Sequence, residues 1–231
     1  MAQAVARTPL QWLSNRARSL TRFTRFMVQN FALMQYVKLV RPLVVVKGKV
    51  TVITPTYRRL DKLKEAMACV RSQTYPHWEH IIVSDGFDQD VQDLVRSVGN
   101  AAVQYHHTRH ISVMGNYQRN KALLYATGEF ILYLDDDNLI EPHCLETMVA
   151  GFESDDIGYV VAPIRYGKGL KEPKPGFRYR EIDLLNYMVR RRLVERVGGQ
   201  SVDHSADFFL IDKIRSITRG VHLDVVIGHH R

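Results

Sequence analysis

Residues 130–138, which read Phe-Ile-Leu-Tyr-Leu-Asp-Asp-Asp-Asn, decide the fold that we expect of this chain. Five apolar residues follow one another without alternation, which is typical of a strand buried on both faces of a parallel sheet. Three carboxylates come directly after this run, and ligands of open α/β sheets bind outside the carboxyl ends of the strands. Adjacent carboxylates repel one another unless a cation lies among them, and Mg²⁺ or Mn²⁺ commonly shares its oxygen ligands with substrate phosphates. The alternative interpretation is a solvated acidic turn.

Polar residues follow two other apolar runs in the same way. Residues 50–54 are predicted to be a strand that leads into residues 55–59, and residues 81–83 are predicted to be a strand that ends on residues 84–86. Apolar residues at helical spacing come after each run, and Gly99 is expected to end the second of these helices. Strands that alternate with helices predict a doubly wound α/β sheet, whose polar strand ends would lie at one edge.

The later part of the chain is patterned less clearly. A helix is predicted over residues 116–127 with Gly128 ending it, a second helix from Pro142 to about residue 152, and a strand over residues 157–161. Glycine and proline residues predict a loop from residue 165 onward, and residues 181–197 are predicted to form a helix. Its arginines at 190–192 form either a solvated face or, if they face the site, a cluster that holds an anionic acceptor or phosphates.

Composition excludes several classes of protein. With 231 residues, 45% hydrophobic and 24% charged, the chain is expected to form one globular domain with a single core. Two cysteines, Cys69 and Cys144, are too few for a disulfide framework or a four-cysteine zinc site, and they suit a reducing compartment. No run of about 18 apolar residues predicts a membrane-spanning helix, and the first 20 residues lack the apolar core of a signal peptide.

The net charge of +8 is concentrated at the N-terminus. Residues 1–60 contain eleven Lys or Arg and no acid, so the remaining residues carry 21 basic and 24 acidic side chains. We therefore divide the chain into a basic amphipathic arm, residues 1–45, and a body, residues 46–231. Residues 9–41 are predicted to be a helix that either binds an anionic membrane surface or packs on the body or on a second subunit. A mitochondrial-type targeting arm and nucleic-acid binding are weaker alternatives.

Five motifs follow one another in the body at fixed spacings. They are TPTYR at 54–58, SQTYP at 72–76 with Trp78 and Glu79, IVSDG at 82–86, Gly115 with RNKAL at 119–123, and GEFILYLDDD at 128–137. With these motifs the chain resembles the family 2 glycosyltransferases of the GT-A fold, well over residues 49–150 and loosely over residues 200–231. The resemblance implies a GT-A domain with a nucleotide-sugar half, residues 46–150, and an acceptor half, residues 151–231.

The resemblance also implies the residues of a sugar-donor site. Asp85 matches the acid that contacts the base or ribose of the donor, and Arg119 matches a position near the ribose and diphosphate. Asp135 and Asp137 match the two ends of the family's Asp-x-Asp motif, with Asp137 the usual ligand of Mn²⁺ or Mg²⁺ and Asp136 the least important of the three for metal. The residues that match the lining of the nucleoside pocket are Pro55, Thr56, Tyr57 and Arg58. The structural alternatives are packing for Tyr57, a surface position for Arg58 and a helix cap for Asp85.

The base that accepts the proton of the acceptor hydroxyl is expected late in the chain. The segment SVDHSADFFL, residues 201–210, resembles the family's acidic motif at the head of a helix. Asp207 is the first candidate for the base; if Asp203 were the base instead, Asp207 would be a helix cap. His229 and His230 follow a strand-like run, residues 223–227, where several GT-A enzymes place a histidine that completes the metal site. The alternative is a solvent-exposed tail.

The family implies an inverting hexosyltransferase that adds one sugar per event. The Gln-x-x-Arg-Trp motif of processive synthases does not occur in the sequence. We expect a UDP- or GDP-linked donor, a glycan or lipid-linked acceptor, and a cytoplasmic location that includes contact with the membrane face through residues 9–41; a homodimer is a further alternative. Two competing functions remain open, namely a nucleotidyltransferase and a non-catalytic nucleotide-sugar-binding module. The first is disfavoured because the loop at residues 55–59 contains no glycine.

Overall fold

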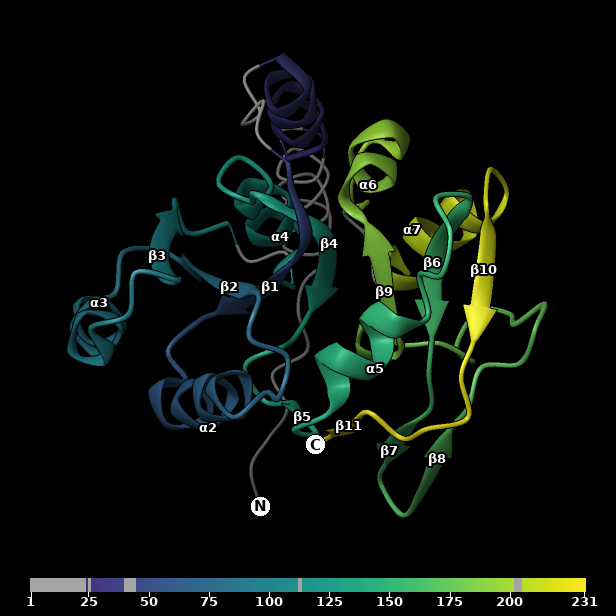
Figure 1. Ribbon diagram of the computed structural model, residues 1–231. Helices are drawn as coiled ribbons and strands as arrows, with labels where there is room; N and C mark the ends of the chain where they lie inside the picture. The colour runs from purple at the N-terminus through teal and green to yellow at the C-terminus, as the bar shows by residue number, and fades with distance from the viewer. Residues whose placement is uncertain (1–23, 25, 40–44, 112–113, 202–204) are drawn as a thin grey trace, which may run out of the picture.

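The computed structural model describes residue 24 and residues 26–39, 45–111, 114–201 and 205–231. A seven-stranded sheet forms its centre (Figure 1). The strands, in spatial order, are β10 (Arg219–His222), β6 (Ile157–Val161), β9 (Tyr187–Arg190), β4 (Gly128–Tyr133), β1 (Val46–Thr56), β2 (Trp78–Asp85) and β3 (Val103–Thr108). Neighbours pair in parallel except at β9, which is antiparallel to both β4 and β6. The prediction of an α/β fold with a mainly parallel sheet is therefore confirmed.

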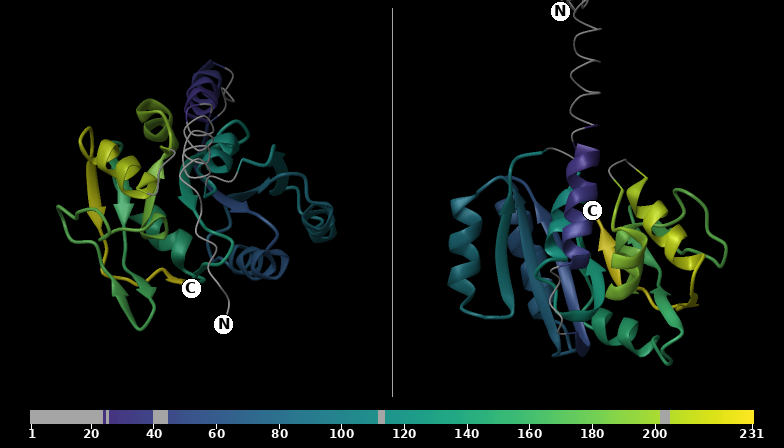
Figure 2. Two further views of the ribbon diagram at one scale, coloured as in Figure 1. Left: turned by 180° about the vertical axis from the view of Figure 1, so that it is seen from behind. Right: turned by 90° about the horizontal axis from the view of Figure 1, so that it is seen from above.

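Helices cover both faces of this sheet (Figures 1 and 2). Ile53 of β1 packs in one core cluster, whereas Val52 packs in another, as alternate side chains of a strand must. The first face is covered by α4 (Asn116–Ala122), α6 (Arg191–Val197), α7 (Ala206–Arg215) and the helical residues 26–39. The second face is covered by α2 (Leu60–Arg71), α3 (Gln89–Val98) and α5 (Cys144–Ala150). Burial on both faces explains why the central strands lack alternation.

Strand register brings the polar strand ends to one edge of the sheet. Thr56 of β1 lies opposite Ser84 of β2, and Asp85 lies opposite Thr108 of β3. On the other side of β1, Ile53 lies opposite Tyr133 of β4, so the acidic stretch begins two residues after the last paired position. The three clusters that the sequence placed after three separate strands therefore meet at the same edge.

Residues 181–197 do not form the single helix that was predicted. They contain a 3-10 turn, η1 (Leu184–Asn186), then β9, then the short helix α6. All four residues of β9 are buried, because this strand lies between β4 and β6. A short apolar run without alternation fits a buried strand and a buried helix equally well, and this ambiguity caused the error.

The arginine cluster at residues 190–192 divides between the interior and the surface. Arg190 is 4% exposed and forms an ion pair with Glu129, and Arg191 is 2% exposed and pairs with Glu195. Arg192 is exposed and donates a hydrogen bond to the carbonyl of Asp155. The prediction of a solvated face is therefore correct only for Arg192. Arg190 and Arg191 are buried in ion pairs within the body.

The predicted helix over residues 116–127 is shorter than expected, because α4 ends at Ala122. Gly128 begins β4 and does not end the helix. A Cβ atom on Gly128 would lie 2.6 Å from Thr51 Oγ1 and 2.7 Å from the carbonyl oxygen of Lys49. The glycine is therefore needed for the close approach of β4 to β1. The Pro142 helix also begins later than predicted, at Cys144.

Helical residues 26–39 pack against the body with one face. Leu33, Met34 and Val37 are buried in the same core cluster as Ile53 of the central sheet. The ring of Phe26 contacts the ring of Tyr117 of α4 edge to face, with centroids 5.5 Å apart. The remainder of the arm proposed for residues 1–45 lies outside the described residues, apart from residue 24 and residue 45, which precedes β1.

A second, four-stranded sheet returns the C-terminus to the acidic edge. Its strands, in spatial order, are β5 (Leu139–Ile140), β11 (Gly228–His230), β7 (Ile164–Tyr166) and β8 (Gly169–Lys171). Residues 223–227 are not the strand that was expected, because the pairing begins at Gly228. The main-chain amide of Arg231 then donates to Asn138 Oδ1 at 3.3 Å. Over the described residues, no helix is both long and apolar enough to span a membrane.

Candidate active site

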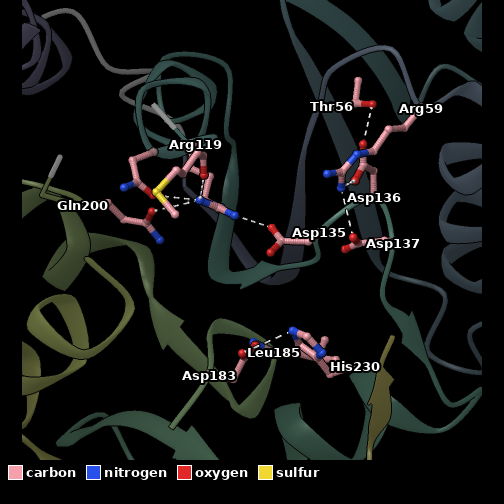
Figure 3. A network of polar contacts seen from close by, with 12 residues as sticks. Thr56, Arg59, Arg119, Asp135, Asp136, Asp137, Asp183, Leu185, Gln200 and His230 are labelled. Carbon is pink, nitrogen blue, oxygen red and sulfur yellow. Dashed lines mark hydrogen bonds and ion pairs between the residues drawn. The ribbon is translucent and has the colours of Figure 1, made fainter. Parts of the chain in front are cut away.

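The three consecutive carboxylates at residues 135–137 point in different directions and have different partners (Figure 3). Asp135 forms an ion pair with Arg119 of α4. Asp136 is buried, 4% exposed, and accepts hydrogen bonds from Thr56 Oγ1 at 2.7 Å and from Arg59 Nη1 at 3.2 Å. The protein's own hydroxyl and guanidinium groups therefore relieve part of the repulsion that three adjacent carboxylates create.

Asp137 also pairs with Arg59, and its side chain is more exposed than that of Asp136. Its Oδ2 atom lies 3.0 Å from Arg59 Nη1 and 3.6 Å from Lys62 Nζ, and 24% of its side chain is exposed. Burial raises the pKa of Asp136, whereas the Thr56 hydroxyl and Arg59 act against that rise. Asp136 is therefore fixed within the loop, while Asp137 stays open to water and to ligands.

Arg119 lies at the centre of the site and is 4% exposed. Its Nη1 atom donates to the carbonyl of Met114 at 3.0 Å and to Asn116 Oδ1 at 2.8 Å, and its Nη2 atom faces Asp135. Burial lowers the pKa of this guanidinium, but the Asp135 and Asp207 carboxylates outweigh burial and raise the pKa above its usual value. The structure thus fixes a permanent positive charge between two carboxylates.

Gly115 allows Arg119 to reach this position. The residue precedes α4 with a φ of +78°, and a Cβ atom there would lie 2.9 Å from Pro55 and 3.3 Å from Arg119 Nη1. A side chain would therefore separate the start of α4 from the end of β1. Pro55 contributes a close surface beneath the Gly115 turn, so the two sequence motifs support each other directly.

Aromatic and acidic groups gather at the ends of β1 and β2. The ring of Tyr57 stacks on His110 with centroids 4.8 Å apart and 17° between the planes, and 41% of Tyr57 is exposed. Arg58 has a φ of +53°, and its guanidinium lies 5.2 Å from the Tyr57 ring. A flat exposed ring with a cation beside it suits the stacking of a nucleobase.

Asp85 is held at the same edge by several donors. Its Oδ1 atom accepts from the amide of Ile111 at 2.7 Å and from Gln118 Nε2 at 2.8 Å, and its Oδ2 atom lies 3.0 Å from His110 Nδ1. The helix cap that was the alternative role for Asp85 belongs instead to Asp88, which accepts from the amide of Val91.

Asp207 lies in the first turn of α7, across from this group. Its pKa is raised to about 6: burial and the Asp183 and Asp135 carboxylates raise it, and Arg119 lowers it. The hydroxyl of Tyr187 donates to the main-chain carbonyl of Asp207 at 3.1 Å, which anchors the helix start to β9. Asp203, the alternative base, lies outside the described residues.

The two C-terminal histidines pair with carboxylates that do not belong to the acidic triplet. His229 Nε2 lies 2.5 Å from Glu141 Oε1, and His230 Nε2 lies 3.8 Å from Asp183 Oδ2. In Figure 3 the His230–Asp183 pair lies apart from Asp137. Within the described residues no group of three or more His, Cys, Asp or Glu side chains is arranged to hold a metal ion.

The side chains at the end of β4 nevertheless fit one half of a metal site. Mg²⁺ and Mn²⁺ are usually held by one or two carboxylates together with substrate phosphates, and not by a cage of protein ligands alone. Asp135 and Asp137 are the carboxylates of the triplet that are not sealed in the loop. A site of this kind is completed by its phosphate ligand.

Several residues of the site were not predicted from the sequence. Arg59 and Lys62 follow the first motif and face the acidic stretch, and their basic character next to a strand end was a usable signal. Asp183 and Gln200 gave no such signal, because they lie in the unpatterned segment and reach the site through β9 and the turn after α6.

Gln200 connects the site to the N-terminal helix. The main-chain amide of Gln200 donates to Asn120 Oδ1 at 2.8 Å. Its main-chain carbonyl accepts from Asn120 Nδ2 at 2.9 Å and from Asn30 Nδ2 at 3.2 Å. Its Oε1 atom lies 3.5 Å from Arg119 Nη1. Helical residues 26–39 therefore support the wall of the site through the buried side-chain amide of Asn30.

Comparisons with known proteins identify the family and the fold. The family model "Glycosyl transferase family 2" matches residues 51–222. A GalNAc(5)-diNAcBac-PP-undecaprenol beta-1,3-glucosyltransferase from Campylobacter jejuni is 27% identical over 103 residues, which is 44% of this chain and 33% of the relative. The chain spans between 16% and 44% of the length of the curated relatives that it matches.

Solved structures share the fold at low sequence identity. S. aureus TarS 1–349 in complex with UDP-GlcNAc has a TM-score of 0.65 and 19% identity, over 79% of this chain and 58% of that chain. The mannosyltransferase PcManGT from Pyrobaculum calidifontis, in complex with GDP-Man and Mn²⁺, has a TM-score of 0.64 and 22% identity, over 90% of this chain and 66% of that chain. Both likenesses concern the fold.

Proposed function

Since this chain belongs to glycosyl transferase family 2, we propose that it transfers a single sugar from a nucleoside diphosphate sugar to an acceptor hydroxyl, with inversion at the anomeric carbon. The observation that carries the proposal is the buried guanidinium of Arg119, which interacts with two carboxylates. Arg119 forms an ion pair with Asp135, from the nucleotide-sugar half, and its pKa is raised by the charge of Asp207, from the acceptor half. A displacement reaction needs groups that stabilise the leaving diphosphate and a base for the acceptor hydroxyl, and the two carboxylates are the candidates for these two roles.

The sugar donor would bind at the ends of β1, β2 and β4. The Tyr57 ring, with Arg58 beside it, would stack on the base, and Asp85 would accept a hydrogen bond from the base or the ribose. Pro55 and Thr56 would line the pocket, and Arg119 would lie by the ribose and diphosphate. The relatives crystallised with UDP-GlcNAc and GDP-Man support a UDP- or GDP-linked sugar.

Asp137, with Asp135 beside it, would hold Mn²⁺ or Mg²⁺, which as a Lewis acid stabilises the departing diphosphate. The complex of PcManGT with Mn²⁺ supports the choice of metal. Arg59 and Lys62 lie against Asp137, so they are placed to neutralise its charge or to contact phosphate oxygens when the carboxylate turns to a metal. Asp136 keeps the loop in shape through Thr56.

Asp207 would act as the base. Its carboxylate takes the proton from the acceptor hydroxyl while the hydroxyl oxygen forms a bond to the anomeric carbon, and the bond from that carbon to the diphosphate oxygen breaks with its electron pair. One displacement inverts the configuration, so no covalent nucleophile is needed. A carboxylate with a pKa near 6 is ionised at neutral pH and is a stronger base than an ordinary aspartate.

The acceptor is proposed to be a glycan or a lipid-linked sugar. The relative from Campylobacter jejuni carries undecaprenol in its name, and a relative from Haloferax volcanii is a glucosyl-dolichyl phosphate glucuronosyltransferase. We place the reaction in the cytoplasm at the membrane face, which the two unpaired cysteines, Cys69 and Cys144, support as thiols of a reducing compartment.

The direct test is turnover with a panel of UDP- and GDP-sugars in Mn²⁺, followed by release of the nucleoside diphosphate. We expect one donor to be hydrolysed slowly in water and faster with a suitable acceptor. Binding of UDP or GDP without any turnover across the panel would contradict the proposal and would favour a non-catalytic binding module. Release of inorganic pyrophosphate from a nucleoside triphosphate would favour a nucleotidyltransferase.

A further inference from the structure

The outer face of helical residues 26–39 carries a row of large apolar side chains that the body does not cover. The inner face is buried, from Phe26 at 3% exposed to Val37 at 0%. The exposed residues of the outer face are Met27 at 47%, Val28 at 64%, Phe31 at 67%, Tyr36 at 54% and Leu39 at 83%. A helix that is apolar on both sides is unusual on a soluble surface, and exposed apolar side chains that adjoin one another often mark an interaction site.

A basic depression adjoins this row. It has a volume of about 190 Å³ and lies between the helix and α6, lined by Lys38, Arg192, Glu195 and Arg196. The carboxylate of Glu195 is buried and pairs with Arg191. In the described part of the chain, neither Lys38 nor Arg196 forms an ion pair with a carboxylate. The depression is therefore lined by three cations and one carboxylate, and its net charge is positive.

Helical geometry places Lys38, which lines the depression, on the same side of the helix as Met27 and Phe31. Met27, Phe31 and Lys38 are separated by four and seven residues, so they lie along one line of the helix surface. Lys38 thus ends the apolar row at the point where the depression begins. Figure 2 shows this helix at the edge of the molecule beside α6. The two features adjoin at Lys38, and we call them together the docking face: Met27, Val28, Phe31, Leu39, Lys38, Arg192 and Arg196.

We propose that the docking face binds the surface of a bilayer that contains anionic phospholipids, with the apolar row among the acyl chains and a lipid phosphate in the basic depression. An interfacial helix combines one apolar face with Lys and Arg at its border, and this is the composition observed here. The inference extends the proposed action on a lipid-linked acceptor, but it does not depend on transfer activity.

Charge favours a membrane over a second copy of the chain. Residues 1–60 contain no acid and eleven Lys or Arg, so the first carboxylate of the sequence is Asp61. A symmetric dimer through the docking face would bring together two copies of the same positively charged surface, and the two copies would repel each other. Anionic headgroups supply the opposite charge, and they attract each Lys or Arg near the surface enough to change binding about fivefold.

The test is sedimentation of the full chain with vesicles of phosphatidylcholine, with and without added phosphatidylglycerol. We expect the wild-type protein to sediment with the anionic vesicles only, and to be released by high salt. The Phe31→Glu/Leu39→Glu variant is expected to bind at least about tenfold more weakly, because both side chains would carry charge into the interface. The Lys38→Gln/Arg196→Gln variant is expected to lose about 25-fold, about fivefold for each cation.

Two control variants have matched exposure elsewhere. Leu170→Glu changes an apolar side chain on β8 that is 57% exposed, and Arg96→Gln removes a cation of α3 whose side chain is 67% exposed. Both are expected to bind as the wild type does. If the doubly acidic variant fails to fold, as a thermal melt would show, the Lys38→Gln/Arg196→Gln variant decides alone.

Three results would overturn the proposal. Equal sedimentation with neutral and anionic vesicles would remove the role of the basic depression. Unchanged binding of both double variants would place membrane contact elsewhere. Absence of binding, together with a dimer in light scattering that Phe31→Glu/Leu39→Glu dissociates, would assign the docking face to a second copy. Because none of these readouts uses a sugar donor, they remain distinct from a failure of the proposed transferase activity.

Discussion

The carboxylates on the nucleotide side of the site and Asp207 on the acceptor side have different surroundings. On the nucleotide side, Asp85, Asp135 and Asp136 are each held by a cation or by hydrogen-bond donors from other elements. On the acceptor side, Asp207 forms no ion pair within the described residues, and burial raises its pKa to about 6. Fixed carboxylates suit the binding of a ligand in one orientation, whereas a desolvated and unpartnered carboxylate suits proton transfer.

Arg119 is shared between the two sides. It pairs with Asp135 and lowers the pKa of Asp207, so the charge that orders the nucleotide side also limits how basic the acceptor side becomes. The guanidinium of Arg119 therefore affects the charge of a carboxylate on each side of the site. Changes on either side, and at Arg119 itself, test whether this division of roles is correct.

The largest effect is expected from Asp207→Asn. Loss of the base should lower kcat by about 10²–10⁴-fold, while binding of the nucleoside diphosphate stays as in the wild type. Asp212→Asn on the same helix is the control, because Asp212 forms an ion pair with Arg215 and its side chain is 42% exposed. Steady-state kinetics and calorimetric titration with UDP or GDP measure the two quantities. A variant that keeps more than a tenth of the activity would remove Asp207 from the mechanism, and Asp203 would be tested next.

A smaller effect that depends on metal is expected from Asp137→Ala. Without this carboxylate the metal is held by fewer ligands, so we expect about 10²-fold lower activity at low Mn²⁺ and partial recovery as Mn²⁺ is raised. The affinity for nucleotide should fall in parallel, unlike in Asp207→Asn. Asp61→Ala, at an acid whose side chain is 94% exposed, is the control. Full activity of Asp137→Ala with an unchanged Mn²⁺ titration would show that Asp137 is not the metal ligand.

The pH dependence tests the shared guanidinium. In the wild type, kcat/KM should fall about tenfold per pH unit below pH 6, because Asp207 must be ionised to accept a proton. Arg119→Gln removes the cation that lowers this pKa, so the acid limb should move to higher pH by about one unit. Arg215→Gln on α7 is the control and should leave the limb in place. A limb that stays or moves to lower pH in Arg119→Gln would separate the two sides of the site.

The nucleotide half was predictable because its signals are local. Each strand is an apolar run, each run ends on a polar cluster, and parallel pairing carries such ends to one edge without further information. Asp85 and Asp135–Asp137 were therefore placed from the sequence. What the sequence did not contain was the partner of each carboxylate, since Arg59 and Arg119 reach them through loop and helix geometry.

The acceptor half was harder to predict because its elements depend on distant contacts. β9 is a strand only because β4 and β6 lie on either side of it, and the segment has no alternation by which to recognise it. Asp183 likewise becomes a neighbour of Asp207 only through the path of that strand. Gly128 was misread for a similar reason, since its role is close approach to β1 and not the end of a helix.

The smallest expected effect concerns folding stability. Asp207→Asn should raise stability although it lowers activity. Asp207 has a pKa of about 6 in the folded protein against 3.8 for an ordinary aspartate, so between these values the folded state binds the proton more tightly than the unfolded state does. Folding stability in the wild type therefore decreases as pH rises from about 4 to about 6, and stays lower above that. The full shift corresponds to about 3 kcal/mol, and we expect about 1 kcal/mol because water still reaches part of the carboxylate.

Asp207→Asn removes this titration. At pH 7–8 the variant should melt about 2–4 °C above the wild type, and the difference should shrink toward zero near pH 4, where the wild-type carboxyl is protonated in both states. The Asp212→Asn control should show no such pH-dependent gain, because Asp212 has a cationic partner. If the melting difference were instead constant with pH, or largest at low pH, Asp207 would be a partnered carboxylate like those of the nucleotide side. The variant that is expected to lose the most activity should thus be the more stable protein, since the charge of the proposed base, which has no ion-pair partner within the described residues, destabilises the fold.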